Sequence, residues 1–251
     1  EVTGIGALRV FEAIREFSPH SKVYQASSSE MFGNSNEVKT ENSRLQPASP
    51  YGTAKVFAHK SAQMYRESYD MFISCGILFN HESPYRGLEF VTKKITSWLA
   101  KIVTKKADKI YLGNINAKRD WGHAKDYVEA MWLMLQQEEP DDYVLASGES
   151  HSVREFIECA FSEIGEKIEW RGKGIKEVGF GLKANKTLIE IDSSYFRPTE
   201  VGALLGNPAK AKSNLGWKAT TKFEDLVKEM VSEDLKNIDI EKKTRSFGID
   251  D

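Results

Sequence analysis

Tyr51 and Lys55 are the residues of this sequence whose types and spacing most clearly suggest chemistry. They lie four residues apart at the start of an amphipathic segment, so both side chains are expected on one helical face. A lysine cation beside a phenol favours the phenolate and lowers the pKa of the tyrosine, which is otherwise near ~10. Such a tyrosine would exchange protons near neutral pH, and it could take the proton of a hydroxyl group while hydride leaves the same carbon.

The surroundings of this pair favour a site over a helix surface. Residues 22–28 have the pattern of a short buried strand that ends in small polar residues, so Ser28 and Glu30 are expected at its carboxyl end. Open α/β sheets bind ligands at that edge. Ser49 and Pro50 form a helix-start signal directly before Tyr51. The sequence therefore predicts that a hydroxyl, a carboxylate and a phenol converge at one edge of a sheet.

Length, charge and cysteine content exclude several classes of protein. The 251 residues suit one large domain or two small ones, and the net charge of −2 with mixed signs argues against a nucleic-acid-binding surface. Cys75 and Cys159 both lie in apolar stretches without a metal-ligand pattern, so we expect reduced thiols and no metal. No apolar run approaches the ~20 residues that span a bilayer, and no charged-then-apolar leader opens the chain. We expect a soluble, cytoplasmic protein with no membrane partner.

Helical and strand patterns alternate along the chain, which predicts an α/β fold with a parallel sheet. The predicted helices cover residues 3–17, a segment that begins at Tyr51, and residues 90–103, 121–137, 152–164, 209–215 and 223–235. The predicted strands cover residues 22–28, 71–79, 109–112, 143–146 and 187–191. Residues 167–186 are interpreted as a surface loop between strands, and the charged tail from Asn237 is expected to fray.

Six motifs follow one another in the order and spacing of a known family. They are residues 25–30 (QASSSE), 49–55 (SPYGTAK), 76–84 (GILFNHESP), 112–114 (LGN), 119–127 (RDWGHAKDY) and 195–200 (YFRPTE). Through them the chain resembles the GDP-mannose 4,6-dehydratases, a branch of the extended short-chain dehydrogenases/reductases. The Tyr-x-x-x-Lys and Arg-Asp-Trp motifs are common to the extended superfamily, whereas residues 80–84, 86–87 and 90–92 indicate the GDP-mannose branch.

The resemblance implies a Rossmann-like, doubly wound parallel sheet with a smaller α/β substrate-binding domain. Residues 1–80 and 117–148 are assigned to the NADP-binding domain, and residues 81–116 and 149–251 to the sugar-nucleotide domain. No Gly-x-x-Gly-x-x-Gly fingerprint opens the chain, although the family begins with a strand, that turn and several βα units. We interpret the sheet as incomplete and the chain as an amino-terminally truncated piece, expected to be inactive without that segment. A native homodimer or homotetramer is expected from the resemblance.

The activity implied by the resemblance is the conversion of GDP-mannose to GDP-4-keto-6-deoxymannose and water, with bound NADP. Tyr51 takes the proton of the mannose 4-hydroxyl as hydride leaves C4; Glu30 then removes the C5 proton, water leaves from C6, and hydride returns to C6. This order is required because a carboxylate cannot remove a proton from an ordinary sugar carbon until an adjacent carbonyl holds the resulting charge. Ser28 and Lys55 complete the predicted catalytic set.

Binding roles follow from the same resemblance. The residues that match His81 and Arg86 contact the nicotinamide dinucleotide in the family, together with Tyr51 and Lys55. The predicted contacts to GDP-mannose are Asn80, Lys94, Arg119, Arg197 and Glu200. Arginine suits forked hydrogen bonds to a diphosphate, and a carboxylate suits hydroxyl groups.

The chain departs from the family at two further positions. Ser28 stands where the family usually has Thr, which preserves a hydroxyl, and Tyr85 stands where it usually has Arg, which removes a positive charge. The histidines outside the motifs are interpreted as surface or helix residues; these are His20, His59 and His151.

Two other classes of function remain open at this stage. The first is another nucleotide-sugar dehydratase or an epimerase of the same fold, although an epimerase needs no acid-base group at Glu30. Glucose nucleotide dehydratases typically carry an Asp-Glu pair where this chain has Ser29 and Glu30. The second is a non-catalytic fragment that keeps the sugar-nucleotide pocket. The choice of NADP over NAD is inherited from the resemblance alone.

Overall fold

A computed structural model describes residues 1–34, 37–196 and 204–246, which form two compact units. The first unit comprises Glu1–His81, Lys118–Ser150 and, from residue 204, the segment up to Thr221. The second comprises Glu82–Ala117 and the described parts of residues 151–198 and 222–251.

The units change after residues 81, 117 and 150, each within two residues of an expected domain boundary. A further change, after residue 221, was not expected. Residues 204–221 belong to the first unit, so their assignment to the sugar-nucleotide domain was wrong. The reason is packing: the backbone of Leu204 bridges that of Arg119, and Leu215 and Trp217 enter a core cluster of the first unit.

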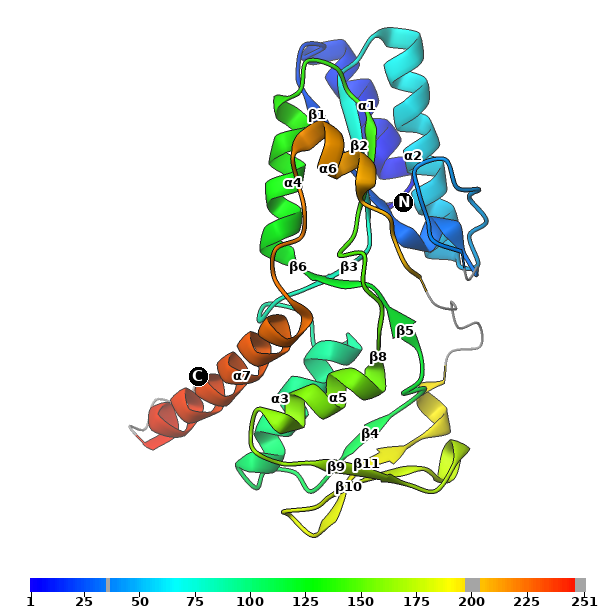
Figure 1. The fold of residues 1–251 in the computed structure, drawn as a ribbon. Coiled ribbons are helices and arrows are strands. Elements are labelled where there is room, and N and C mark those ends of the chain that lie inside the picture. Colours follow the sequence, from blue (N-terminus) through cyan, green and yellow to red (C-terminus); the bar gives the residue numbers. More distant parts are fainter. Residues whose placement is uncertain (35–36, 197–203, 247–251) are drawn as a thin grey trace. The chain divides into compact units, whose positions relative to one another are not determined.

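The first unit is built on a parallel sheet, as predicted (Figure 1). Its strand order is β1 (Val23–Ser28), β2 (Ile73–Leu78), β7 (Asp142–Leu145). Ser28 pairs with Leu78, and Leu78 pairs with Leu145, so the three strands end at the same level. Side chains that follow β1 therefore emerge at a common carboxyl edge.

Helices cover both faces of this sheet. The helices α1 (Ile5–Phe17) and α2 (Pro50–Tyr69) lie on one face, and α4 (Ala124–Gln136) and α6 (Ala209–Leu215) lie on the other. Alternate strand side chains enter the two resulting cores. The core on the α1 and α2 side contains Phe11, Ala62, Tyr65, Met71, Ile73 and Cys75. The core on the α4 and α6 side contains Leu78, Tyr127, Ala130, Met134, Tyr143, Leu145, Ala211, Leu215 and Trp217.

The start of α2 is determined locally and confirms the prediction. Ser49 is the N-cap, its Oγ accepts a hydrogen bond from the backbone N of Gly52 at 3.0 Å, and Pro50 occupies the first turn. A Cβ atom on Gly52 would lie 2.7 Å from the backbone oxygen of Glu30. Glycine is therefore required for the first turn of α2 to approach the short 3₁₀-helix η1 (Ser29–Phe32) that follows β1.

The second unit has a mixed four-stranded sheet and three principal helices. The strand order is β4 (Ile110–Leu112), β11 (Lys186–Ile191), β10 (Val178–Gly181), β9 (Ile168–Arg171), with only the β4–β11 pair parallel. The helices are α3 (Val91–Val103), α5 (Val153–Ser162) and α7 (Phe223–Ser246), which pack on one another. A capping box between Ser152 and Glu155 begins α5, so the predicted N-cap is confirmed.

The remaining elements are short. They are β3 (Asn80–Glu82), β5 (Lys118–Arg119), β6 (Trp121–His123), β8 (His151–Ser152), η2 (Gly174–Lys176) and η3 (Ser193–Tyr195). None of the helices in the described ranges has both the length and the apolar character needed to cross a membrane.

Three expectations about elements were wrong. Residues 167–186 contain the paired strands β9 and β10 rather than a loop. The glycines that suggested a loop are needed for packing, because Cβ atoms on Gly179 and Gly181 would lie 2.7 and 2.5 Å from side-chain atoms of Ile189 and Leu188. The predicted helix over residues 121–137 begins with the strand β6, and the last helix continues to Ser246 instead of fraying from residue 237.

A buried ion pair joins α3 to α7 inside the second unit. The carboxylate of Asp234 accepts hydrogen bonds from Lys93 Nζ and from Thr96 Oγ1, and Lys93 Nζ also donates to the backbone oxygen of Pro84. Asp234 and Lys93 are only 6% and 8% exposed, so their opposite charges neutralise each other in the interior of the unit.

Replacing Asp234 with Ala should reduce the free energy of unfolding by about 3–5 kcal/mol, because it leaves the ammonium of Lys93 buried and unpaired. Denaturant titration would measure the change. The exposed neighbouring pair between Glu233 and Lys236 provides the control, and Glu233→Ala should change stability by no more than about 0.5 kcal/mol. Equal effects of the two substitutions would contradict this role of the pair.

Candidate active site

The four predicted catalytic residues all lie at the carboxyl end of β1. Ser28 is the last residue of β1, and its Oγ accepts a hydrogen bond from the backbone N of Glu30 at 3.2 Å. This bond caps η1 and fixes the backbone that carries the Glu30 carboxylate. Tyr51 and Lys55 come from the first two turns of α2, which packs against both η1 and β1. The structure thus brings the segments that carry Ser28, Glu30, Tyr51 and Lys55 together at the carboxyl end of β1.

Contacts with β1 and with Tyr51 fix the side chain of Lys55. Its Nζ donates a hydrogen bond to the backbone oxygen of Ala26 at 2.8 Å and lies 5.6 Å from the centroid of the Tyr51 ring. Burial lowers the pKa of Lys55. Tyr51 remains half exposed, and the ammonium group of Lys55 stands beside its ring.

An open cleft of about 650 Å³ borders this pair within the first unit. Tyr51 and Lys55 line it together with residues 23–26 of β1, residues 1–3 and residues of α1. Cofactor sites commonly have volumes of ~300–1,000 Å³ with a few polar groups on apolar walls. The volume of the cleft falls in this range, and Lys55 lies in its lining.

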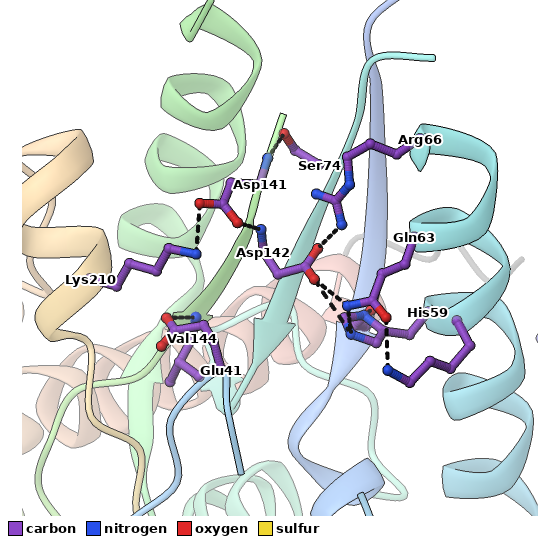
Figure 2. Close-up of polar contacts among 11 residues, drawn as sticks. Glu41, His59, Gln63, Arg66, Ser74, Asp141, Asp142, Val144 and Lys210 are labelled. Atoms are coloured by element: carbon purple, nitrogen blue, oxygen red, sulfur yellow. Dashed lines mark hydrogen bonds and ion pairs between the residues drawn. The ribbon is translucent and has the colours of Figure 1, made fainter. Parts of the chain in front are cut away.

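A polar network connects α2 to the sheet in the turns that follow Lys55 (Figure 2). His59 Nδ1 is 2.8 Å from the Oγ of Ser27 on β1. One and two turns further along, Gln63 Nε2 and Arg66 Nη2 donate to the two carboxylate oxygens of Asp142, the first residue of β7, at 2.5 and 2.8 Å. With the Lys55 bond, these contacts fix successive turns of α2, and hence the register of its catalytic face against β1.

The three histidines outside the motifs were interpreted as surface or helix residues, and the structure places them in three different environments. His20 is exposed, as expected. His59 is a helix residue but is only 3% exposed, because it lies between α2 and the sheet. His151 lies in the strand β8 and its ring stacks on Phe223 with centroids 3.9 Å apart, so its interpretation was wrong.

His59, Cys75 and Asp142 form a group of metal-ligand types that the sequence pattern did not reveal. Their ligand atoms all lie within 4.8 Å of one another, and they come from three separate elements. Both carboxylate oxygens already accept hydrogen bonds, and the positive charge of Arg66 opposes a cation there. Burial raises the pKa of the Cys75 thiol, which therefore keeps its proton. These contacts fit a closed hydrogen-bond network better than a metal centre.

The predicted cofactor residues after β2 fall into different units. His81 belongs to the first; its Nδ1 is 2.9 Å from the backbone oxygen of Phe79, and its ring stacks on Tyr127 with centroids 4.9 Å apart. Arg86 belongs to the second; its Nε is 3.0 Å from Glu82 Oε2, and its guanidinium lies 3.3 Å from the centroid of the Phe90 ring. These contacts orient both side chains, and their contact with a cofactor stays a prediction.

The predicted substrate residues are placed only in part. Asn80 and Arg119 are half-buried residues of β3 and β5 in the first unit, and Lys94 of α3 lies over the Tyr195 ring at 3.4 Å in the second. Arg197 and Glu200 lie outside the described residues.

Comparison with known proteins identifies the family. The family model for GDP-mannose 4,6 dehydratase matches residues 1–230. The GDP-mannose 4,6 dehydratase of Dictyostelium discoideum is 54% identical over 95% of this chain, and that of Homo sapiens is 49% identical over 94%.

The chain belongs to the GDP-mannose 4,6-dehydratase family. It spans 68% of the length of the Dictyostelium protein and 64% of the length of the human one.

Solved structures confirm the Rossmann-like fold. A dTDP-glucose 4,6-dehydratase from Bacillus anthracis in complex with NAD superposes with a TM-score of 0.76 at 23% identity, covering 94% of this chain and 68% of that one. RMD from Pseudomonas aeruginosa complexed with NADPH gives a TM-score of 0.77 at 18% identity, covering 93% and 73%. At these identities the likeness establishes the fold alone.

The buried position of His59 makes stability depend on pH. Burial lowers its pKa below the ordinary value of 6.5, so the unfolded chain binds a proton more readily than the folded one. The contribution of neutral His59 is therefore fully present above pH 6.5 and is lost as the pH falls from there through the folded pKa. His59→Gln should flatten the dependence of the unfolding free energy on pH between about 7 and 5, measured by denaturant titration at each pH. The exposed His20→Gln serves as control, and a wild-type slope in His59→Gln would contradict the assignment.

Proposed function

We propose that the protein bearing this chain converts GDP-mannose to GDP-4-keto-6-deoxymannose and water. The observation that carries the proposal is the anchoring of Glu30 beside the first turn of α2, where Gly52 lets the helix approach the backbone of η1. That contact brings the backbone of Glu30 close to the helix that carries Tyr51 and Lys55, which supports a carboxylate acting together with Ser28, Tyr51 and Lys55. A 4-epimerase needs only the latter set, whereas an elimination needs the carboxylate as well.

In the first step Tyr51 acts as the base. Its phenolate, stabilised by the ammonium of Lys55, accepts the proton of the mannose 4-hydroxyl, while Ser28 shares the hydrogen bond to that oxygen. A bound nicotinamide cofactor supplies the acceptor for the C4 hydride and the donor for its return to C6. The half-exposed Tyr51 borders the cleft in which such a cofactor would lie, and Lys55 would hold it there.

In the second step Glu30 acts on the oxidised sugar. The 4-ketone makes the neighbouring C5–H acidic, Glu30 removes that proton, and the C6–O bond breaks. Glu30 then gives its proton to the departing hydroxyl, so that one water is released. After hydride returns to C6, Tyr51 gives a proton back to C5, and the overall reaction contains no net oxidation.

The remaining roles follow from the family. The two structural neighbours are complexes with NAD and with NADPH, which supports a nicotinamide dinucleotide. We propose NADP bound by Tyr51, Lys55, His81 and Arg86. The proposed contacts to GDP-mannose are those of Asn80, Lys94, Arg119, Arg197 and Glu200. A homodimeric or homotetrameric assembly and a cytoplasmic location stay predictions.

Isotope transfer tests the reaction. GDP-mannose labelled with deuterium at C4 should give a product that has lost one water and carries the deuterium at C6, as measured by mass spectrometry. A product with unchanged mass and inverted C4 would identify an epimerase and refute the proposal.

Substitutions test the two residue roles separately. Glu30→Gln should lower product formation by about 10²–10⁴-fold and leave oxidation at C4, so that reduced cofactor accumulates in its absorbance band. Tyr51→Phe should abolish both signals, because no base remains for the first step. Glu16→Gln on the exposed side of α1 is the matched control. Full-rate dehydration by Glu30→Gln would remove Glu30 from its role.

A further inference from the structure

Asp120 is a fully buried carboxylate that the proposed chemistry does not use. It is 0% exposed and follows Arg119 directly, between the strands β5 and β6 of the first unit. Burial raises its pKa, whereas hydrogen bonds from its neighbours act in the opposite direction.

Four hydrogen bonds converge on this carboxylate. Oδ1 accepts from the backbone N and the Oγ of Ser147 at 2.8 and 2.7 Å. Oδ2 accepts from the backbone N of Gly148 at 3.1 Å and of Gly206 at 3.3 Å. Ser147 and Gly148 follow β7, whereas Gly206 belongs to the segment that leads into α6. Asp120 therefore ties three distant stretches of the chain together at the carboxyl edge of the sheet.

The backbone around this junction is closely packed. Arg119 forms an isolated parallel bridge with Leu204, which is 1% exposed and lies in a core cluster with Phe79 and Ala146. A Cβ atom on Gly206 would lie 2.4 Å from the Cβ of Ala146, so the segment cannot shift inward. The backbone of Arg119 is thereby fixed on one side by Leu204 and through its neighbour by the hydrogen bonds of Asp120.

We propose that Asp120 is a positioning residue for diphosphate binding, which sets the direction in which the Arg119 guanidinium emerges. The inference rests on the proposed function, in which Arg119 contacts GDP-mannose. Asp120 itself does not touch the substrate, because its carboxylate is enclosed by the four donors. It acts by holding the backbone of Arg119, and a forked guanidinium contact to a diphosphate depends on that direction.

Asp126 offers a matched control in the same unit. It is 3% exposed and its carboxylate also accepts several hydrogen bonds, from the backbone N and Oγ1 of Thr220 and from the backbone N of Thr221, at 2.9–3.1 Å. Its donors are different from those of Asp120. Asp→Asn at either position exchanges an acceptor oxygen for an amide that faces N–H or O–H donors, so both variants should lose stability in a similar way.

The test is calorimetric titration of the whole protein that bears this chain with GDP, below the unfolding temperature of every variant. Asp120→Asn should weaken GDP binding at least about tenfold, which corresponds to about 1.4 kcal/mol. Asp126→Asn should bind GDP like the unaltered chain. Because Asp120 acts through Arg119, adding Asp120→Asn to Arg119→Ala should weaken binding no further than Arg119→Ala alone.

The outcomes separate this inference from the proposed function. If Arg119→Ala weakens GDP binding but Asp120→Asn does not, or if Asp120→Asn and Asp126→Asn weaken it equally, the positioning role is refuted and the function stands. An additive double variant likewise refutes action through Arg119. If the unaltered chain binds UDP or dTDP in preference to GDP, the proposed substrate is wrong, whatever the Asp120 variants do. If the whole protein that bears this chain binds no nucleoside diphosphate, both proposals fail.

Discussion

The contact between the first two turns of α2 and the end of β1 is the constraint on which the candidate site depends. Two features produce this contact. Gly52 has no side chain, which lets the helix approach the Glu30 backbone, and Lys55 donates a hydrogen bond to the backbone oxygen of Ala26. The first sets the distance between helix and 3₁₀ turn, and the second sets the rotation of the helix. A phenol and a carboxylate on separate elements can act on one sugar only when both this distance and this rotation are fixed.

Buried carboxylates hold the surrounding framework in place. Asp142 fixes the far end of the α2 face, Asp120 joins the turns at the carboxyl edge, and Asp126 joins α4 to the segment after α6. In each case a charged acceptor satisfies several donors that would otherwise be buried without partners, and hydrogen bonds to charged groups are stronger than neutral ones. Hydrogen-bonded carboxylates thus connect the helices and turns around the sheet, and the apolar cores fill the space between the helices and the sheet.

Local signals in the sequence predicted the elements that carry the chemistry. The Ser49-Pro50 cap placed the start of α2 correctly, and the apolar run before Ser28 placed β1, because both depend on residues close together in the chain. The strands β9 and β10 were missed because the glycines that suggest a loop are required by side chains of β11. The burial of His59 and the junction at Asp120 were missed because their partners come from distant segments, and no spacing along the chain reveals such contacts.

The ionisation of Tyr51 tests the central claim most directly. Tyrosine labelled with ¹³C at Cζ would report the titration of each phenol by NMR, and Tyr51→Phe would assign the signal of interest. The arrangement of Lys55 beside the ring predicts that Tyr51 titrates below the ordinary value near ~10, and that Lys55→Met moves the midpoint back toward it. A Tyr51 midpoint at or above ~10 that is unchanged by Lys55→Met would show that the pair does not work as a unit, and the account of the site would be wrong.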